Sequence, residues 1–169
     1  MKKVLATLFI LLLVVGFTNA QPKNYIGAGV EIGMASGNFA DALDLSAGFG
    51  GSARYEMSLS PNMAGYGSVG YLSWGGDNYT LSAVVIMAGG KYYFVPNIYG
   101  VAEVGYSSFS LSVDGGGTAY DLDSKIGFGV GAGIEVPVGS MMLDLTAMYK
   151  LAATDFNYID IRAGLKFAL

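Results

Sequence analysis

The stretch KIGFGVGAGIEV at positions 125–136 alternates strictly between two kinds of residue. One set of alternate positions holds only glycine and the charged residues Lys125 and Glu135, and the other holds only apolar residues. A period of two is the period of a β-strand, whose successive side chains point to opposite faces. The stretch therefore predicts a strand with one apolar face and one face of small and charged side chains.

Four further segments alternate in the same way, with exceptions at two methionines, and predict strands at 26–33, 45–59, 141–151 and 158–169. Three less regular strands are expected at 63–74, 80–94 and 98–113. For the last two strands, we decide which face points into the barrel by assuming that Lys91 and Glu103 point away from lipid. The segment Ala83 to Met87 is apolar at every position, which leaves its orientation open. Eight strands of about eleven residues result, the length that a tilted membrane strand needs.

The connections between these strands fall into two classes. Three are tight and contain proline: Ser60-Pro61-Asn62, Val95-Pro96-Asn97 and Pro137-Val138-Gly139-Ser140. The other four are mostly longer and polar: Ala35 to Asp44, Gly75 to Tyr79, Asp114 to Asp123 and Ala152 to Phe156. Short turns on one rim and long loops on the other are typical of outer-membrane barrels, with both termini on the periplasmic side. We therefore expect an all-β fold, an eight-stranded antiparallel up-and-down transmembrane β-barrel.

The first twenty residues are expected to be an export signal. Lys2 and Lys3 precede an apolar stretch at 4–17 that is too short to span a bilayer, and Thr18-Asn19-Ala20 ends it. Cleavage after Ala20 would leave a barrel domain at 21–169, and a retained anchor helix is the alternative. No cysteine follows the segment, which excludes a lipid-anchored lipoprotein.

The composition favours a membrane-exposed surface. Only 13% of the residues are charged while 53% are hydrophobic, and an ordinary soluble domain has about 25% charged residues. A soluble eight-stranded ligand carrier resembling the lipocalins would need the inverted barrel, with glycine and serine outside. Such a surface is poor for a soluble protein, so this alternative is disfavoured.

Aromatic residues on the apolar faces gather near the strand ends, as an interfacial girdle requires. Toward the outer rim we expect Phe49, Trp74, Tyr106, Phe128 and Tyr149. Toward the inner rim we expect Tyr55, Tyr92, Phe94 and Phe167.

The pattern resembles the small OmpA/OmpX-like outer-membrane barrels of Gram-negative bacteria. The segments that carry the resemblance are Gly89-Gly90-Lys91-Tyr92-Tyr93-Phe94, the turn Pro96-Asn97, the strand from Ile98 to Tyr106, and the closing Phe167-Ala168-Leu169. The resemblance implies a monomeric barrel that contacts outer-membrane lipid and lipopolysaccharide, and the barrel-insertion machinery during assembly. It is specific for the fold and weak for function.

The chain has no histidine and no cysteine, and enzymatic barrels of this membrane resemble one another in depending on histidine. General-base chemistry near neutral pH usually uses histidine too, so we expect no enzyme. Metal sites built from these two residue types are impossible, and no ordered calcium-loop spacing occurs. We expect no cofactor, and nothing in the charge distribution suggests nucleic acid.

Strand positions opposite the apolar face carry equal numbers of acids and bases, so a neutral barrel interior is expected. These residues are Glu31, Arg54, Glu56, Lys91, Glu103, Lys125, Glu135, Asp144, Lys150, Asp160, Arg162 and Lys166. Eight strands leave an interior just wide enough for side chains. The residues can therefore form a structural ion-pair plug or line a narrow conducting path.

The last hairpin predicts two of these ion pairs from a single register. In an antiparallel hairpin, directly opposed residue numbers have a constant sum, and Lys150 with Asp160 gives the same sum as Asp144 with Lys166. One turn centred on Asp155 would then satisfy four charges. As the alternative, barrel shear or a bulge would move each contact by two residues and place Lys150 opposite Tyr158 or Arg162, on the same lumen face.

Seven acids lie in or at the rim of the long loops, which contain no Lys or Arg: Asp41, Asp44, Asp77, Asp114, Asp121, Asp123 and Asp155. They can serve solubility alone, or bridge divalent cations to anionic outer-leaflet lipid. Asp114, Asp121 and Asp123 flank three glycines and are the hypothesised weak cation site.

Three functions remain open. A structural or surface-interaction protein of the cell envelope is preferred, a narrow pore for ions or small solutes is the alternative, and a soluble carrier is disfavoured.

Overall fold

The structure, a computed structural model, describes residues 23–42, 44–45, 47–76, 79–113, 119–121, 124–153 and 156–169. Among these residues no helix is long and apolar enough to cross a membrane.

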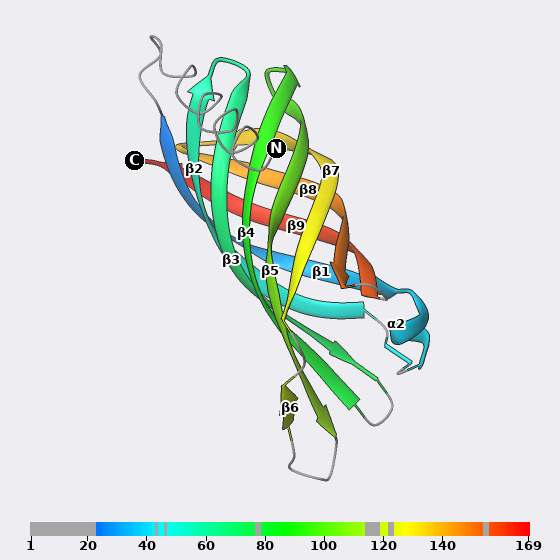
Figure 1. Cartoon of the computed structure of the whole chain (residues 1–169). Helices are drawn as coiled ribbons and strands as arrows, with labels where there is room; N and C mark the ends of the chain where they lie inside the picture. The colour runs from blue at the N-terminus through cyan, green and yellow to red at the C-terminus, as the bar shows by residue number, and fades with distance from the viewer. Residues whose placement is uncertain are drawn as a thin grey trace, which may run out of the picture.

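Eight long antiparallel strands close into a barrel (Figure 1). They are β1 (Asn24–Ser36), β2 (Ala47–Ser60), β3 (Met63–Gly75), β4 (Tyr79–Val95), β5 (Ile98–Val113), β7 (Lys125–Val138), β8 (Met141–Ala153) and β9 (Phe156–Ala168). Each strand pairs with the next along the chain, and β1 pairs with β9 to close the ring. The predicted fold is confirmed.

Two short elements lie in the connections at one end of the barrel. The helix α2 (Asn38–Ala42) follows β1, and the strand β6 (Ala119–Asp121) extends the sheet beyond β5. Neither element was expected from the sequence, because both interrupt segments that read as polar loops.

The three connections predicted to be tight are tight turns, but in the third one Pro137 and Val138 belong to the end of β7, and only Gly139 and Ser140 form the turn. In the β7–β8 turn, Gly139 has a φ of 64°, a conformation that glycine adopts without steric cost. The amide of Tyr93 donates to the carbonyl of Asn62, which joins the β2–β3 turn to the neighbouring strand β4. The start of β1 and the end of β9 lie at the same end of the barrel as these turns (Figure 1).

Apolar side chains cover the outside of the barrel. Ile126, Phe94 and Val30 are each about two-thirds exposed, at 68%, 67% and 66%. Lys91 and Glu103 are buried inside, which confirms the phase assumed for β4 and β5. This distribution is the inverse of that in a soluble protein and matches a barrel surrounded by hydrocarbon.

Trp74 is the exception among the residues expected at the outer girdle, because its side chain is fully buried inside the barrel. Its indole Nε1 donates to the carbonyl of Gly33 at 2.8 Å. A Cβ atom at Gly48 would lie 2.5 Å from the indole ring, so glycine on the neighbouring strand makes the room. Leu45, also expected on the outward face, is buried as well.

Candidate functional site: the charged lumen

The barrel interior holds eleven of the twelve charged residues predicted for it, and all eleven are buried. Lys125 is the exception, because it lies at the beginning of β7 and is exposed. The interior is therefore less evenly balanced than the sequence suggested, with six buried acids and five buried bases among the described residues.

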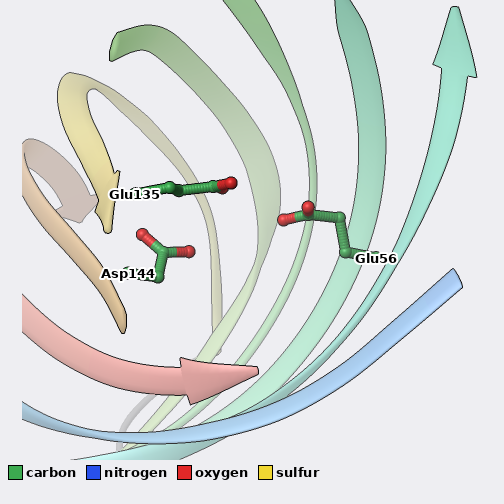
Figure 2. Close-up of side chains that lie close together, drawn as sticks. All are labelled: Glu56, Glu135 and Asp144. Atoms are coloured by element: carbon green, nitrogen blue, oxygen red, sulfur yellow. The ribbon is translucent and has the colours of Figure 1, made fainter. Parts of the chain in front are cut away.

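Three carboxylates meet at one point in the lumen. Glu56 on β2, Glu135 on β7 and Asp144 on β8 each offer an oxygen within 4.8 Å of the others, and Figure 2 shows them pointing toward one another. We call these residues, together with Lys91 and Lys166, the Lys91 cluster. Three strands supply the acids because alternation places every second side chain of each strand inside.

The ammonium group of Lys91 lies among these carboxylates. Its Nζ atom is 2.7 Å from Oε2 of Glu56, 2.9 Å from Oε1 of Glu135 and 2.7 Å from Oδ2 of Asp144. Lys166 contacts the same cluster at 2.5 Å from Glu56 and 2.7 Å from Glu135. Three carboxylates are a donor set that suits a divalent cation, but here the ammonium groups of two lysines contact them and offset most of their charge.

Tyrosines add further hydrogen bonds to the Lys91 cluster. The hydroxyl of Tyr99 donates to Asp144, and the hydroxyl of Tyr93 donates to Glu135 at 2.8 Å. The ring of Tyr99 also lies 4.3 Å from the Nζ atom of Lys91, a cation–π distance. A buried ionic group is tolerated only when such partners satisfy it, so this cluster has the features of a structural plug.

A second ionic group surrounds Lys150 on β8. Its Nζ atom lies 2.8 Å from Oδ2 of Asp160 and 3.2 Å from Oε1 of Glu103. The hydroxyl of Tyr66 donates to the other oxygen of Glu103 at 2.6 Å. We call Lys150, Asp160, Glu103 and Tyr66 the Lys150 cluster.

Two arginines and Glu31 lie in the lumen beside these clusters. The guanidinium of Arg54 lies 4.1 Å from the centre of the Tyr66 ring and 3.7 Å from Asp144. Arg162 Nε is 3.6 Å from Glu31, and Ser52 donates to the same Glu31 oxygen. The charged network thus spans the lumen between strands that are not neighbours in the sheet.

An apolar plug fills the opposite end of the lumen, toward α2. The ring of Phe156 lies 5.3 Å from that of Trp74 and 5.7 Å from that of Phe109, both edge-on. Ala40 of α2 and Leu45 pack into the same cluster. The remaining members are Leu72, Leu81, Ala83, Val85, Met87 and Tyr158.

Sequence reasoning missed this apolar plug. The signal was the run from Ala83 to Met87, which is apolar at every position because one of its faces meets lipid and the other meets the plug. Ala83, Val85 and Met87 point inward, while Val84 and Ile86 point outward.

The register predicted for the last hairpin is wrong. Lys150 is opposite Tyr158, and Asp144 is opposite Gly164, a shift of two residues that accompanies an irregularity between Leu151 and Ala153. Lys150 still contacts Asp160, across a diagonal. The predicted pair of Asp144 with Lys166 is wrong, because Asp144 contacts Lys91, and Lys166 contacts Glu56 and Glu135.

The hypothesised cation site in the long loop lies outside the described residues. Asp114 and Asp123 are not described, and Asp121 is described only as part of the backbone of β6.

Comparisons with known proteins agree with this architecture. The family model for the outer membrane protein beta-barrel domain matches residues 6–167. Ail, the attachment invasion locus protein of Yersinia pestis, is similar at a TM-score of 0.63 and 13% identity, over 89% of this chain and 100% of that one. No curated protein matches the chain.

Two further solved structures share the architecture. Neisserial surface protein A is similar at a TM-score of 0.57 and 17% identity, over 86% of this chain and 97% of that one. The N-terminal β-barrel domain of Pseudomonas aeruginosa OprF is similar at a TM-score of 0.55 and 12% identity, over 87% of this chain and 100% of that one. At these identities the likeness establishes the fold alone.

Proposed function

Because this chain belongs to the outer membrane protein beta-barrel domain family, we propose that it is a sealed barrel with a structural or surface-interaction role in the cell envelope. The observation that carries the proposal is the filling of the lumen. The apolar plug closes the end toward α2, and the Lys91 and Lys150 clusters occupy the remainder. Each of the five acids in the two clusters lies within 3.2 Å of a lysine Nζ atom, so these carboxylates are held in ion pairs and do not line an open path for ions.

The plug argues against the narrow pore. An ion crossing the barrel would have to pass Trp74, Phe109 and Phe156, whose edge-to-face packing leaves it no polar partner. The Lys91 cluster would also have to release its internal hydrogen bonds. The interior therefore favours rigidity over transport.

We further propose the orientation and maturation of the chain. Residues 1–20 are removed as a signal peptide, the barrel-insertion machinery places the barrel, and the tight turns and termini face the periplasm. The barrel works as a monomer surrounded by lipid and lipopolysaccharide. The long loops then face the outside of the cell and supply its contacts.

The loops point to cationic partners. They carry seven acids and no Lys or Arg, so they repel polyanions and attract cations. Ail has been solved in complex with a heparin analogue, sucrose octasulfate, which is a polyanion. We propose that this chain differs from Ail in this respect and that Asp114, Asp121 and Asp123 bridge divalent cations to anionic lipid.

We also infer that the barrel is not an enzyme. The chain has no histidine to act as a base near neutral pH, and the buried acids of the lumen contact lysine, arginine, tyrosine or serine.

A complementation experiment tests the proposal. A Gram-negative strain lacking the chain should take up more hydrophobic dye, and the wild-type chain should restore dye exclusion. A variant with Asp114, Asp121 and Asp123 changed to Asn should reach the same level in the membrane but bind less calcium at the cell surface. If the strain lacking the chain showed the same dye uptake and the same calcium binding at the cell surface as the wild type, both the structural and the surface-interaction role would be refuted.

A further inference from the structure

The outward face of β2 to β5 contains a hollow of about 690 Å³, near the tight-turn end of the barrel. These four strands lie side by side (Figure 1). The floor of the hollow consists of Gly65 and Gly67 on β3 and of Ala88 and Gly90 on β4. Gly67 is opposite Ala88 and Gly65 is opposite Gly90, so the four form one compact patch.

Larger apolar side chains flank this patch on the β2 side and along part of the β5 side. Tyr55 and Met57 of β2 are opposite Gly67 and Gly65, and form one wall. On β5, Val104 is opposite Ala88 and forms a second wall, whereas Ala102, opposite Gly90, leaves the hollow shallow on that side.

The register places larger side chains beyond the two ends of the hollow. Nearer the turns, Met63 is opposite Tyr92, and both are about half exposed. Further from the turns, Val69 is opposite Ile86, and both are again about half exposed. The hollow is thus a local depression between rows of larger side chains on the outer surface.

Internal packing does not demand glycine at two of the three glycine positions of the floor, Gly67 and Gly90, whereas a Cβ atom at Gly65 would lie 3.3 Å from the side chain of Leu59. A Cβ atom at Gly67 would meet nothing within 4 Å, and one at Gly90 would meet only the Ala64 carbonyl at 3.7 Å. Elsewhere glycine makes room for a neighbour, as Gly48 does for Trp74. Glycine in a strand interior weakens the strand and often marks a place where another molecule approaches closely.

We propose that this hollow is a binding site for one acyl chain of a membrane phospholipid. The hollow is continuous with the apolar surface that faces hydrocarbon, because the chain crosses the outer membrane as a barrel. Its volume falls within the range of small-ligand sites, and apolar side chains line it. A small depression between larger side chains suits a slender, flexible hydrocarbon better than the broad convex surface of a second barrel. In the orientation proposed above, the lipid belongs to the periplasmic leaflet, but the site itself does not depend on that orientation.

Native mass spectrometry after reconstitution tests the site. The folded chain is placed in vesicles of phosphatidylethanolamine and phosphatidylglycerol, re-extracted in mild detergent and weighed with its bound lipid. We expect one phospholipid on the wild-type barrel, and at least a tenfold lower bound fraction on a Gly67→Leu, Gly90→Leu variant. Val30→Leu, on the outward face of β1, is the matched control and should retain the lipid.

Three outcomes would overturn the proposal: no lipid on the wild type, equal retention by all variants, or a mass of two barrels that the double substitution converts to one. Gel mobility before and after heating verifies that each variant is folded. If the double variant does not insert, the single Gly67→Leu variant replaces it, because the new Cβ meets no neighbouring atom.

Discussion

The Nζ atom of Lys91 on β4 lies 2.7 Å from Oδ2 of Asp144 on β8, although β5 and β7 separate these strands in the sheet. The contact therefore crosses the lumen and does not follow a strand pair. The same ammonium group also reaches Glu56 and Glu135, so one lysine joins three strands to β4. Closure of the barrel brings these residues together, and their charges stabilise it once closed.

Removal of Lys91 should destabilise the barrel. Lys91→Met leaves three buried carboxylates with fewer cations, and breaking a buried ion pair costs about 3 to 5 kcal/mol. Unfolding by urea in phospholipid vesicles measures the loss. Lys23→Met is the control, because Lys23 is exposed and should change stability by less than about 0.5 kcal/mol. Equal stability of the two variants would mean that the Lys91 cluster contributes nothing.

The same variant should acquire sensitivity to calcium. Without the Lys91 ammonium, Glu56, Glu135 and Asp144, whose oxygens lie within 4.8 Å of one another, keep a single ammonium, that of Lys166, which contacts Glu56 and Glu135. Three carboxylates then exceed one ammonium, and the excess negative charge should attract a divalent cation. Calcium should then raise the melting temperature of Lys91→Met. Calcium binding in the lumen should not raise the melting temperature of the wild type. Adding Glu135→Gln to the variant should abolish the response. A response that persists in this double variant would place the cation elsewhere.

Lys150 and Asp160 should be energetically coupled. Removing one partner leaves the other charge buried in the lumen without its ion pair. Each single variant, Lys150→Met or Asp160→Asn, should therefore lose more stability than the double variant. A double-mutant cycle should give a coupling of about 0.5 to 3 kcal/mol. Lys150 and Glu56 contact different partners, and a cycle on them should be nearly additive. Additivity for Lys150 with Asp160 would contradict the contact.

Trp74 should be shielded from lipid. It is the sole tryptophan and is buried in the lumen, so a brominated phospholipid should hardly quench its fluorescence. A Trp74→Phe, Phe128→Trp variant moves the indole to an outward position and should be strongly quenched. Similar quenching of both proteins would mean that Trp74 faces lipid in the aromatic girdle, as the sequence pattern had predicted.

The sequence was sufficient to predict the faces of most strands. A strict period of two assigns each residue to one face, and this is why Glu135 was expected inside. Lys91 and Glu103 lie on less regular strands, and their inward placement was an assumption from their charge. The pattern fails where both faces are apolar, as at Trp74 and from Ala83 to Met87. There the lumen is filled by apolar side chains, and hydrophobicity no longer distinguishes lipid from interior.

Contact partners were less predictable than faces. The pair of Lys91 with Asp144 depends on the closure and shear of the barrel, which no local pattern encodes. In the last hairpin, an irregularity near Leu151 moved the register by two residues. A shift of two preserves the face, so Lys150 and Asp160 still meet while Asp144 and Lys166 do not.

Conductance of the refolded wild-type chain in a planar lipid bilayer tests the central claim, a sealed lumen, most directly. The apolar plug and the Lys91 cluster predict that no discrete channel openings occur, under conditions in which a porin inserted as a positive control conducts. Reproducible single-channel steps from the wild-type chain would contradict the sealed barrel and establish the narrow pore in its place.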